Sequence, residues 1–161
     1  MTARDPHQLA LGWLSQRMLS AAEMRRRLTL RGVPDAIVEQ TLAGLMHSGL
    51  IEDARMARTL LSRLLDDGRS GPGAIRARLR LRGLDDETIT QAWQLEASAI
   101  DWTAIALRIR ERYDITDSRG RARFARHLAR QGFPAALIRR LATADDAADK
   151  GSDSDDGLED H

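Results

Sequence analysis

The chain has 161 residues, with 25 Lys and Arg against 24 Asp and Glu, so its formal net charge is only +1. It has no cysteine, which excludes disulfides and thiolate chemistry, and no apolar run near the ~20 residues that a membrane span needs. Aromatic residues make up 4%, and leucine, alanine and arginine dominate. This composition predicts a helical protein, and without a leader sequence or a membrane span we expect it in the cytoplasm.

Three helices are predicted in the first 49 residues. Leu9 and Trp13 mark an amphipathic helix over 7–17, and Ser20 with Glu23 forms a capping box at the start of a helix over 20–30. Gly32 has the properties of a residue that ends a helix in a left-handed conformation. A third helix follows over 35–47.

The same pattern returns twice along the chain. Gly83 and Gly132 follow Gly32 at intervals of 51 and 49 residues, and bulky apolar residues stand eight and four positions before each glycine. Residues 75–82 alternate like a strand, but the sister copies do not, so a helix is predicted there. A shared period near 50 predicts an all-α fold of three tandem three-helix repeats, 1–49, 50–98 and 99–142, in an elongated curved array. The small residues that open the second helices, Ser20, Gly71 and Gly120, are predicted N-caps.

The segment 143–161 has a different composition. It holds eight of the 24 acidic residues and one of the 25 basic residues, so residues 1–142 carry 24 basic against 16 acidic side chains. Low hydrophobicity with many acids predicts a disordered tail. Its acids either fold back on the arginines and compete with DNA, or only keep the chain soluble.

Arginines recur on the second helix of each repeat, where Glu23 is the only acid. Uncompensated guanidinium groups repel one another unless an anionic surface is near, and DNA phosphates are the commonest such surface. A solvated charged face is the alternative. The predicted residues for binding of DNA or of a nucleoprotein filament are Arg25, Arg26, Arg31, Arg76, Arg78, Arg80, Arg82, Arg121, Arg123, Arg126 and Arg130.

Catalytic signals are missing from the sequence. The four histidines lack metal-ligand spacing, and residues 68–73 (GRSGPG) fit a turn better than a phosphate loop or a nucleophile elbow. The acidic pairs Asp66-Asp67 and Asp85-Asp86 are interpreted as helix-end residues. We therefore expect no enzymatic activity, no catalytic residue, no metal site and no cofactor.

Together these motifs resemble a known family. Ser20-x-x-Glu23, residues 49–57 (GLIEDARMA), residues 71–83 (GPGAIRARLRLRG) and Gly132-Phe133 are similar to motifs of RecX, the bacterial regulator of the RecA recombinase, over about residues 7–142. Glu52 and Met56 replace the usual Asp and Phe, both conservatively. The long acidic tail is not a hallmark of the family.

The resemblance implies a function without catalytic residues. A RecX protein binds RecA and lies in the groove of the RecA filament on single-stranded DNA, where it hinders filament extension, strand exchange, ATP hydrolysis and coprotease activity. That function belongs to DNA repair, recombination and the SOS response. We expect direct DNA binding, no membrane partner and a monomer.

Two other classes of function remain open. Short paired helices joined at a glycine suggest a helix-turn-helix-like DNA-binding transcription regulator, which would discriminate among duplex sequences. A purely protein-binding helical scaffold would have no affinity for nucleic acid.

Overall fold

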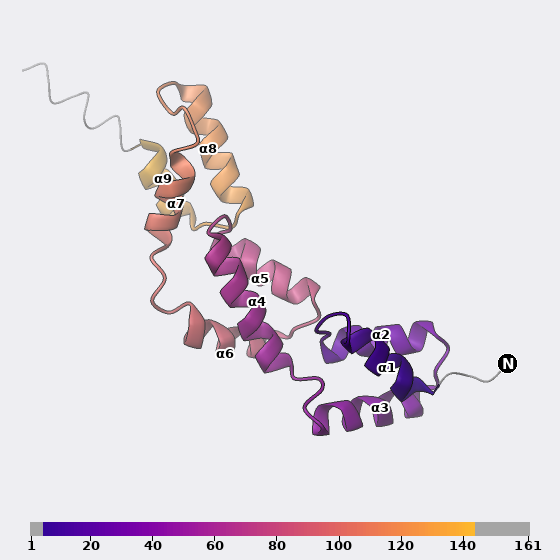
Figure 1. The fold of residues 1–161 in the computed structure, drawn as a ribbon. Helices are drawn as coiled ribbons and strands as arrows, with labels where there is room; N and C mark the ends of the chain where they lie inside the picture. The colour runs from indigo at the N-terminus through magenta and orange to yellow at the C-terminus, as the bar shows by residue number, and fades with distance from the viewer. Residues whose placement is uncertain (1–4, 144–161) are drawn as a thin grey trace, which may run out of the picture. The chain divides into compact units, whose positions relative to one another are not determined.

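The computed structural model describes residues 5–143, and within that range the chain forms nine α-helices and no strand (Figure 1). The predicted all-α class is confirmed. The acidic tail lies outside the described residues except for Thr143, which is the last residue of a helix. The helices are α1 (Pro6–Leu14), α2 (Ala21–Leu30), α3 (Asp35–His47), α4 (Asp53–Asp67), α5 (Pro72–Leu81), α6 (Asp86–Glu96), α7 (Trp102–Arg110), α8 (Ser118–Arg130) and α9 (Ala135–Thr143).

The predicted capping box opens α2. The Ser20 hydroxyl accepts a hydrogen bond from the Glu23 amide at 3.1 Å, and the Glu23 carboxylate accepts one from the Ser20 amide at 3.1 Å. Two amide groups that the first turn of a helix leaves unpaired are thereby satisfied. The sequence therefore fixes the start of α2 locally.

The three repeated glycines end α2, α5 and α8 as predicted. Gly32, Gly83 and Gly132 have φ of 75°, 77° and 74°, in the left-handed region where a side chain is disfavoured. The residue after each glycine donates its amide hydrogen to the carbonyl five residues earlier, as in Val33 to Leu28 at 3.2 Å. This Schellman arrangement satisfies carbonyls at the helix end.

Some predicted boundaries are wrong. The first helix ends at Leu14 and does not continue to Arg17. Gly120 is not an N-cap, because Asp117 caps α8 by accepting the Gly120 amide hydrogen at 2.6 Å.

The repeated apolar positions make the core. The residues eight and four positions before each glycine are all 0% exposed: Met24, Leu28, Ile75, Leu79, Phe124 and Leu128. Val38 and Ile89, six after their glycines, are also buried, whereas their counterpart Ile138 is only half-buried. In α9 the buried pair is Leu137 and Leu141. Two leucines four residues apart bury more apolar surface than Ile138 with Ala142 would. The buried face of α9 is therefore shifted by one residue relative to those of α3 and α6, which carry Val38 and Ile89.

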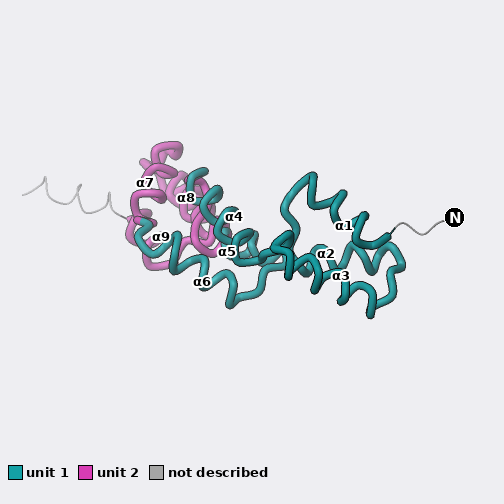
Figure 2. Tube along the Cα trace, turned by 60° about the horizontal axis from the view of Figure 1, so that its bottom comes forward, with its two compact units in different colours: residues 1–67, 75–100 teal, residues 68–74, 101–161 magenta. Residues whose placement is uncertain are grey.

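The described chain divides into two compact units (Figure 2). Unit 1 comprises 5–67 and 75–100, where α1, α2 and α3 pack together and α4 packs against α6. Unit 2 comprises 68–74 and 101–143, where α8 packs against α9. The first turn of α5 joins unit 2 through backbone bonds such as Gly73 amide to Gly132 carbonyl, at 3.0 Å. The repeat boundaries 1–49, 50–98 and 99–142 stay predictions.

Candidate nucleic-acid interface

The predicted arginines all lie on or directly after α2, α5 and α8, but they differ in what they contact. Three of them form ion pairs with acids on other helices or helix ends. Arg25 Nε lies 2.7 Å from Glu39 of α3, Arg80 Nε lies 2.7 Å from Asp86 of α6, and Arg82 Nε lies 2.8 Å from Glu23 of α2. The hydrogen bonds that Arg25 donates to the Glu39 carboxylate raise the pKa of Arg25. The expectation that these guanidinium groups lack compensation is therefore wrong for these three, because their partner acids stand outside the helix that carries the arginine.

Tryptophans in unit 1 lie beneath further arginines. The Arg76 guanidinium stands 4.3 Å from the centroid of the Trp93 ring, and Arg27 and Arg31 stand 5.5 and 5.8 Å from that of Trp13. An arginine on an indole face is held in place by a cation–π attraction while its edge keeps donors for other partners. These tryptophans support the arginines from within the fold.

Arg121 in unit 2 has a structural role. Its guanidinium donates to the carbonyls of Ile115 at 3.4 Å and Thr116 at 3.1 Å, in the connection between α7 and α8. This connection is further ordered by Asp114, whose pKa is lowered by hydrogen bonds from Thr116 and by the charge of Arg123. Arg121 therefore positions the start of α8.

Five of the predicted arginines are exposed, lie over no aromatic ring, and have guanidinium groups that make no hydrogen bond or ion pair with any residue in 5–143. Their guanidinium donors are unused within the described fold, and a phosphate oxygen is a suitable acceptor for them. They are Arg26, Arg78, Arg123, Arg126 and Arg130.

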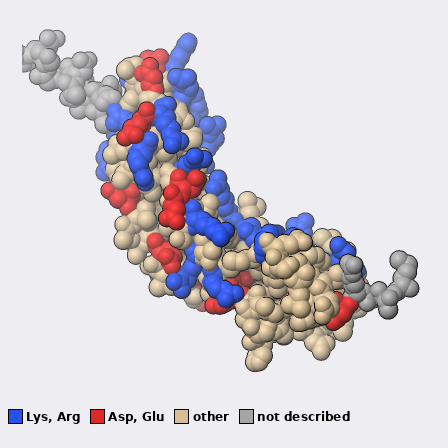
Figure 3. All heavy atoms as spheres, in the orientation of Figure 1, with Lys and Arg blue, Asp and Glu red and all other residues tan. Residues whose placement is uncertain are grey.

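The clearest basic surface belongs to α8, which contains no acidic residue. In Figure 3, blue side chains gather along the outer edge of this helix. Burial and the charge of nearby Arg130 lower the pKa of His127, which favours its neutral form. Its ring lies 5.5 Å from that of Tyr113, so the apolar side of α8 faces aromatic packing while its arginines face outward.

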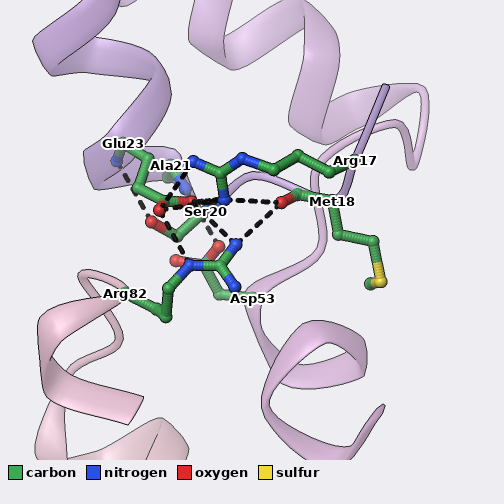
Figure 4. Close-up of polar contacts among 7 residues, drawn as sticks. All are labelled: Arg17, Met18, Ser20, Ala21, Glu23, Asp53 and Arg82. Atoms are coloured by element: carbon green, nitrogen blue, oxygen red, sulfur yellow. Dashed lines mark hydrogen bonds and ion pairs between the residues drawn. The ribbon is translucent and has the colours of Figure 1, made fainter. Parts of the chain in front are cut away.

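A polar cluster in unit 1 contains one predicted binding residue in a different role (Figure 4). The guanidinium groups of Arg17 and Arg82 converge on the Glu23 carboxylate, at 3.2 and 2.8 Å, and Arg82 also donates to the Met18 carbonyl at 2.9 Å. Asp53, the first residue of α4, accepts the Ala21 amide hydrogen at 2.9 Å. The cluster thus joins the N-terminus of α2 to α4 and to the end of α5.

The ionisation of this cluster follows from its contacts. Burial raises the pKa of Glu23, but the hydrogen bonds and charges of Arg82, Ser20 and Arg17 outweigh it, so the pKa lies below 4.5. Burial raises the pKa of Asp53 above 3.8, against the Ala21 hydrogen bond and together with the charges of Asp85 and Glu23. The sequence predicted Glu23 as part of a capping box, but it did not predict that Glu23 and Asp53 would interact, since they stand on different helices.

A second group of arginines, on α4, was not among the binding residues predicted from the sequence. Arg55, Arg58 and Arg63 border a polar pocket of about 450 Å³ that also includes Thr59 and Ser62. Arg58 pairs with Glu96 at 2.9 Å, and Arg55 lies 3.6 Å from Glu52. The spacing of these arginines along one face of α4 is the signal that could have revealed them.

Among residues 5–143, no group of three or more His, Cys, Asp or Glu side chains is arranged to hold a metal ion. In the same range, no helix combines the length and the apolar character needed to cross a bilayer. The Asp66-Asp67 pair closes the C-terminal end of α4, where N-terminal capping does not explain it, whereas Asp85 caps α6 through the Thr88 amide at 2.7 Å.

Comparison with known proteins finds similar sequences. The family model described as RecX, first three-helix domain, matches residues 7–45. A Regulatory protein RecX of Pseudomonas entomophila is 34% identical over 144 residues, covering 87% of this chain and 91% of that protein. One of Stenotrophomonas maltophilia is 37% identical over 146 residues, covering 88% of each.

Solved structures share the fold. The crystal structure of RecX from Lactobacillus salivarius has a TM-score of 0.73 at 20% identity, covering 88% of this chain and 95% of that one. Another, a crystal structure of regulatory protein RecX, has a TM-score of 0.70 at 23% identity, covering 84% of this chain and 69% of that one. These structures are similar in their all-helical architecture.

Proposed function

The chain belongs to the RecX family of regulatory proteins, and we propose that it regulates the RecA recombinase by binding RecA and its filament on single-stranded DNA. It occupies the filament groove across neighbouring protomers and inhibits strand exchange, ATP hydrolysis and coprotease activity. Its place is then in DNA repair, recombination and the SOS response. It acts in the cytoplasm, as a monomer and without chemistry of its own.

The observation that supports this proposal is the set of unused guanidinium donors on α2, α5 and α8. Arg26, Arg78 and Arg126 represent the three helices, and each is exposed without a partner in 5–143. A nucleoprotein filament presents phosphates at regular intervals, so arginines distributed over several helices can each neutralise one. Contacts made by several segments at once add avidity, which allows inhibition at few copies per filament.

The other predicted arginines contribute differently. Arg31 and Arg76, which lie over tryptophans, keep donors at the guanidinium edge and belong to the binding surface. Arg25, Arg80 and Arg82 would have to leave carboxylates before they could bind phosphate. We therefore rank these three, with Arg121, below the other predicted residues.

The test is the rate of ATP hydrolysis by RecA assembled beforehand on single-stranded DNA, with this protein added in substoichiometric amounts. A fall in rate well below one copy per protomer is expected. The triple variant Arg26→Ala, Arg78→Ala, Arg126→Ala should need more protein for the same inhibition. The triple variant Arg108→Ala, Arg112→Ala, Arg139→Ala is the matched control, because it removes the same charge from exposed positions outside the proposed surface.

Different results would point to different functions. An unchanged rate, with binding to free DNA retained, would contradict regulation of the filament. Preference among duplex sequences would favour the transcription regulator, and absence of any affinity for nucleic acid at low salt would favour the protein-binding scaffold.

A further inference from the structure

Within unit 1, α4 and the end of α5 line an apolar groove whose leucines the proposed DNA contacts do not use. Its floor is made by Leu60 and Leu64 of α4 and Leu79 and Leu81 of α5, and its volume is about 440 Å³. Leu79 is fully buried, whereas Leu81 is 84% exposed. An exposed leucine beside further apolar surface leaves a patch that water solvates poorly.

Arginines surround this apolar floor. Arg63, Arg78 and Arg82 line the same groove, and none of the acidic residues within 5–143 does. Arg82 is engaged by Glu23, but Arg63 and Arg78 are exposed and have no hydrogen bond or ion pair in 5–143. Apolar contact at the centre with charged donors at the rim is the arrangement of a peptide-binding site. A nucleic-acid backbone would satisfy the arginines and leave the leucines uncovered.

The chain itself contains a segment of the complementary chemistry. Residues 144–161 hold eight acids and one lysine, and Leu158 is their only large apolar residue. Asp155 and Asp156 precede this leucine closely, and Glu159 and Asp160 follow it directly. Eighteen residues span about 60 Å when fully extended, far more than a groove between two short helices.

We propose that the α4–α5 groove is a binding site for this acidic segment. Leu158 lies on the leucine floor, and the carboxylates on either side of it pair with Arg63 and Arg78. Because Arg78 also belongs to the proposed phosphate-binding set, a bound segment competes with DNA for it. The inference concerns the chain's own segment and can be tested without RecA, so it stands or falls separately from the proposed function.

The absence of native cysteines makes a direct test possible in the full chain. A nitroxide spin label on Ser154→Cys should erase amide NMR signals around the groove, at residues 60–64 and 78–82, and reduction of the label should restore them. Adding Leu158→Ala should weaken this effect without altering the groove itself. Adding Arg63→Glu with Arg78→Glu should abolish it, while Arg108→Glu, a matched exposed arginine outside the groove, should leave it unchanged.

The apolar part of the site has its own control. Leu81→Ser should weaken the effect, whereas Leu30→Ser should not, although Leu30 holds the same position two residues before its glycine and is 74% exposed.

Mixing spin-labelled chains with isotope-labelled, unmodified chains tells whether the segment comes from the same chain or from a second copy, and either result supports binding of the segment in the groove. The proposal would be overturned if the label erased no amide signals, or erased them uniformly or around another part of the chain. It would also be overturned if the groove variants left the signal loss unchanged. The amide spectrum of each variant reports whether the variant is folded.

Discussion

Arg82 and Glu23 stand 59 residues apart in the sequence, and the arginine donates two hydrogen bonds to the carboxylate, at 2.8 and 3.2 Å. Glu23 also completes the capping box of α2 with Ser20. One carboxylate thus serves both the local start of a helix and the tertiary joint between α2 and the end of α5. Arg82, which is one of the predicted DNA-binding arginines, therefore holds two segments of unit 1 together.

Replacing Arg82 tests that role. The side chains of Arg82 and Glu23 are 29% and 18% exposed, so solvent screens their attraction only partly. We expect Arg82→Ala to lower the free energy of unfolding by about 1–2 kcal/mol. Arg78 makes no ion pair with any residue in 5–143, so we expect Arg78→Ala to lower it by less than about 0.5 kcal/mol. Urea denaturation followed by circular dichroism measures both. Equal losses for the two variants would show that the ion pair contributes nothing.

Low pH should weaken the interaction between Glu23 and Arg82. The pKa of Glu23 is lower in the folded chain than its ordinary 4.5, so the folded state binds fewer protons than the unfolded state does. Its contribution to stability is therefore present above about pH 4.5 and is lost as the pH falls through 4.5 toward the folded pKa. We expect unfolding free energies measured across this range to decline more steeply for the native chain than for Glu23→Gln. Parallel curves for the two proteins would rule this out, since all other carboxyl groups are common to both.

The glycine positions differ in whether they have room for a Cβ atom. A Cβ on Gly120 would collide with the Asp114 carbonyl, whereas a Cβ on Gly12, inside α1, would meet nothing within 4 Å. We expect Gly120→Ala to cost more than about 2 kcal/mol through overpacking, and Gly12→Ala to stabilise by about 0.5–1 kcal/mol through helix propensity. Thermal unfolding of the two variants gives the comparison. A harmless Gly120→Ala would mean that the turn before α8 can shift.

The two classes of arginine should separate in salt titrations of single-stranded DNA binding. Each phosphate contact contributes about 0.7 to the slope of log K against log salt, so loss of Arg26, Arg78 and Arg126 should reduce the slope by about 2. Loss of Arg25, Arg80 and Arg82 should change it less, because these arginines already pair with carboxylates. Fluorescence anisotropy at several salt concentrations measures both slopes. If the paired set changed the slope more, the assignment of the interface to the unpaired arginines would be wrong.

The sequence by itself determined most of the helices and the repeated core. Spacings of three and four residues, a capping box and left-handed glycines are local features, and their physical causes act within one or two turns of helix. For this reason Met24, Ile75 and Phe124 could be placed in the core from the pattern alone, and each is fully buried. Family membership followed from the same motifs.

Only the tertiary structure decided which arginines keep their donors. The partner of Arg25 is 14 residues away on α3 and that of Arg82 is 59 residues away on α2, and no periodic pattern encodes such pairings. The buried face of α9 and the packing of Gly120 against Asp114 were likewise set by neighbouring segments. An arginine's charge is written in the sequence, but whether a carboxylate already neutralises it depends on which helices the fold brings together.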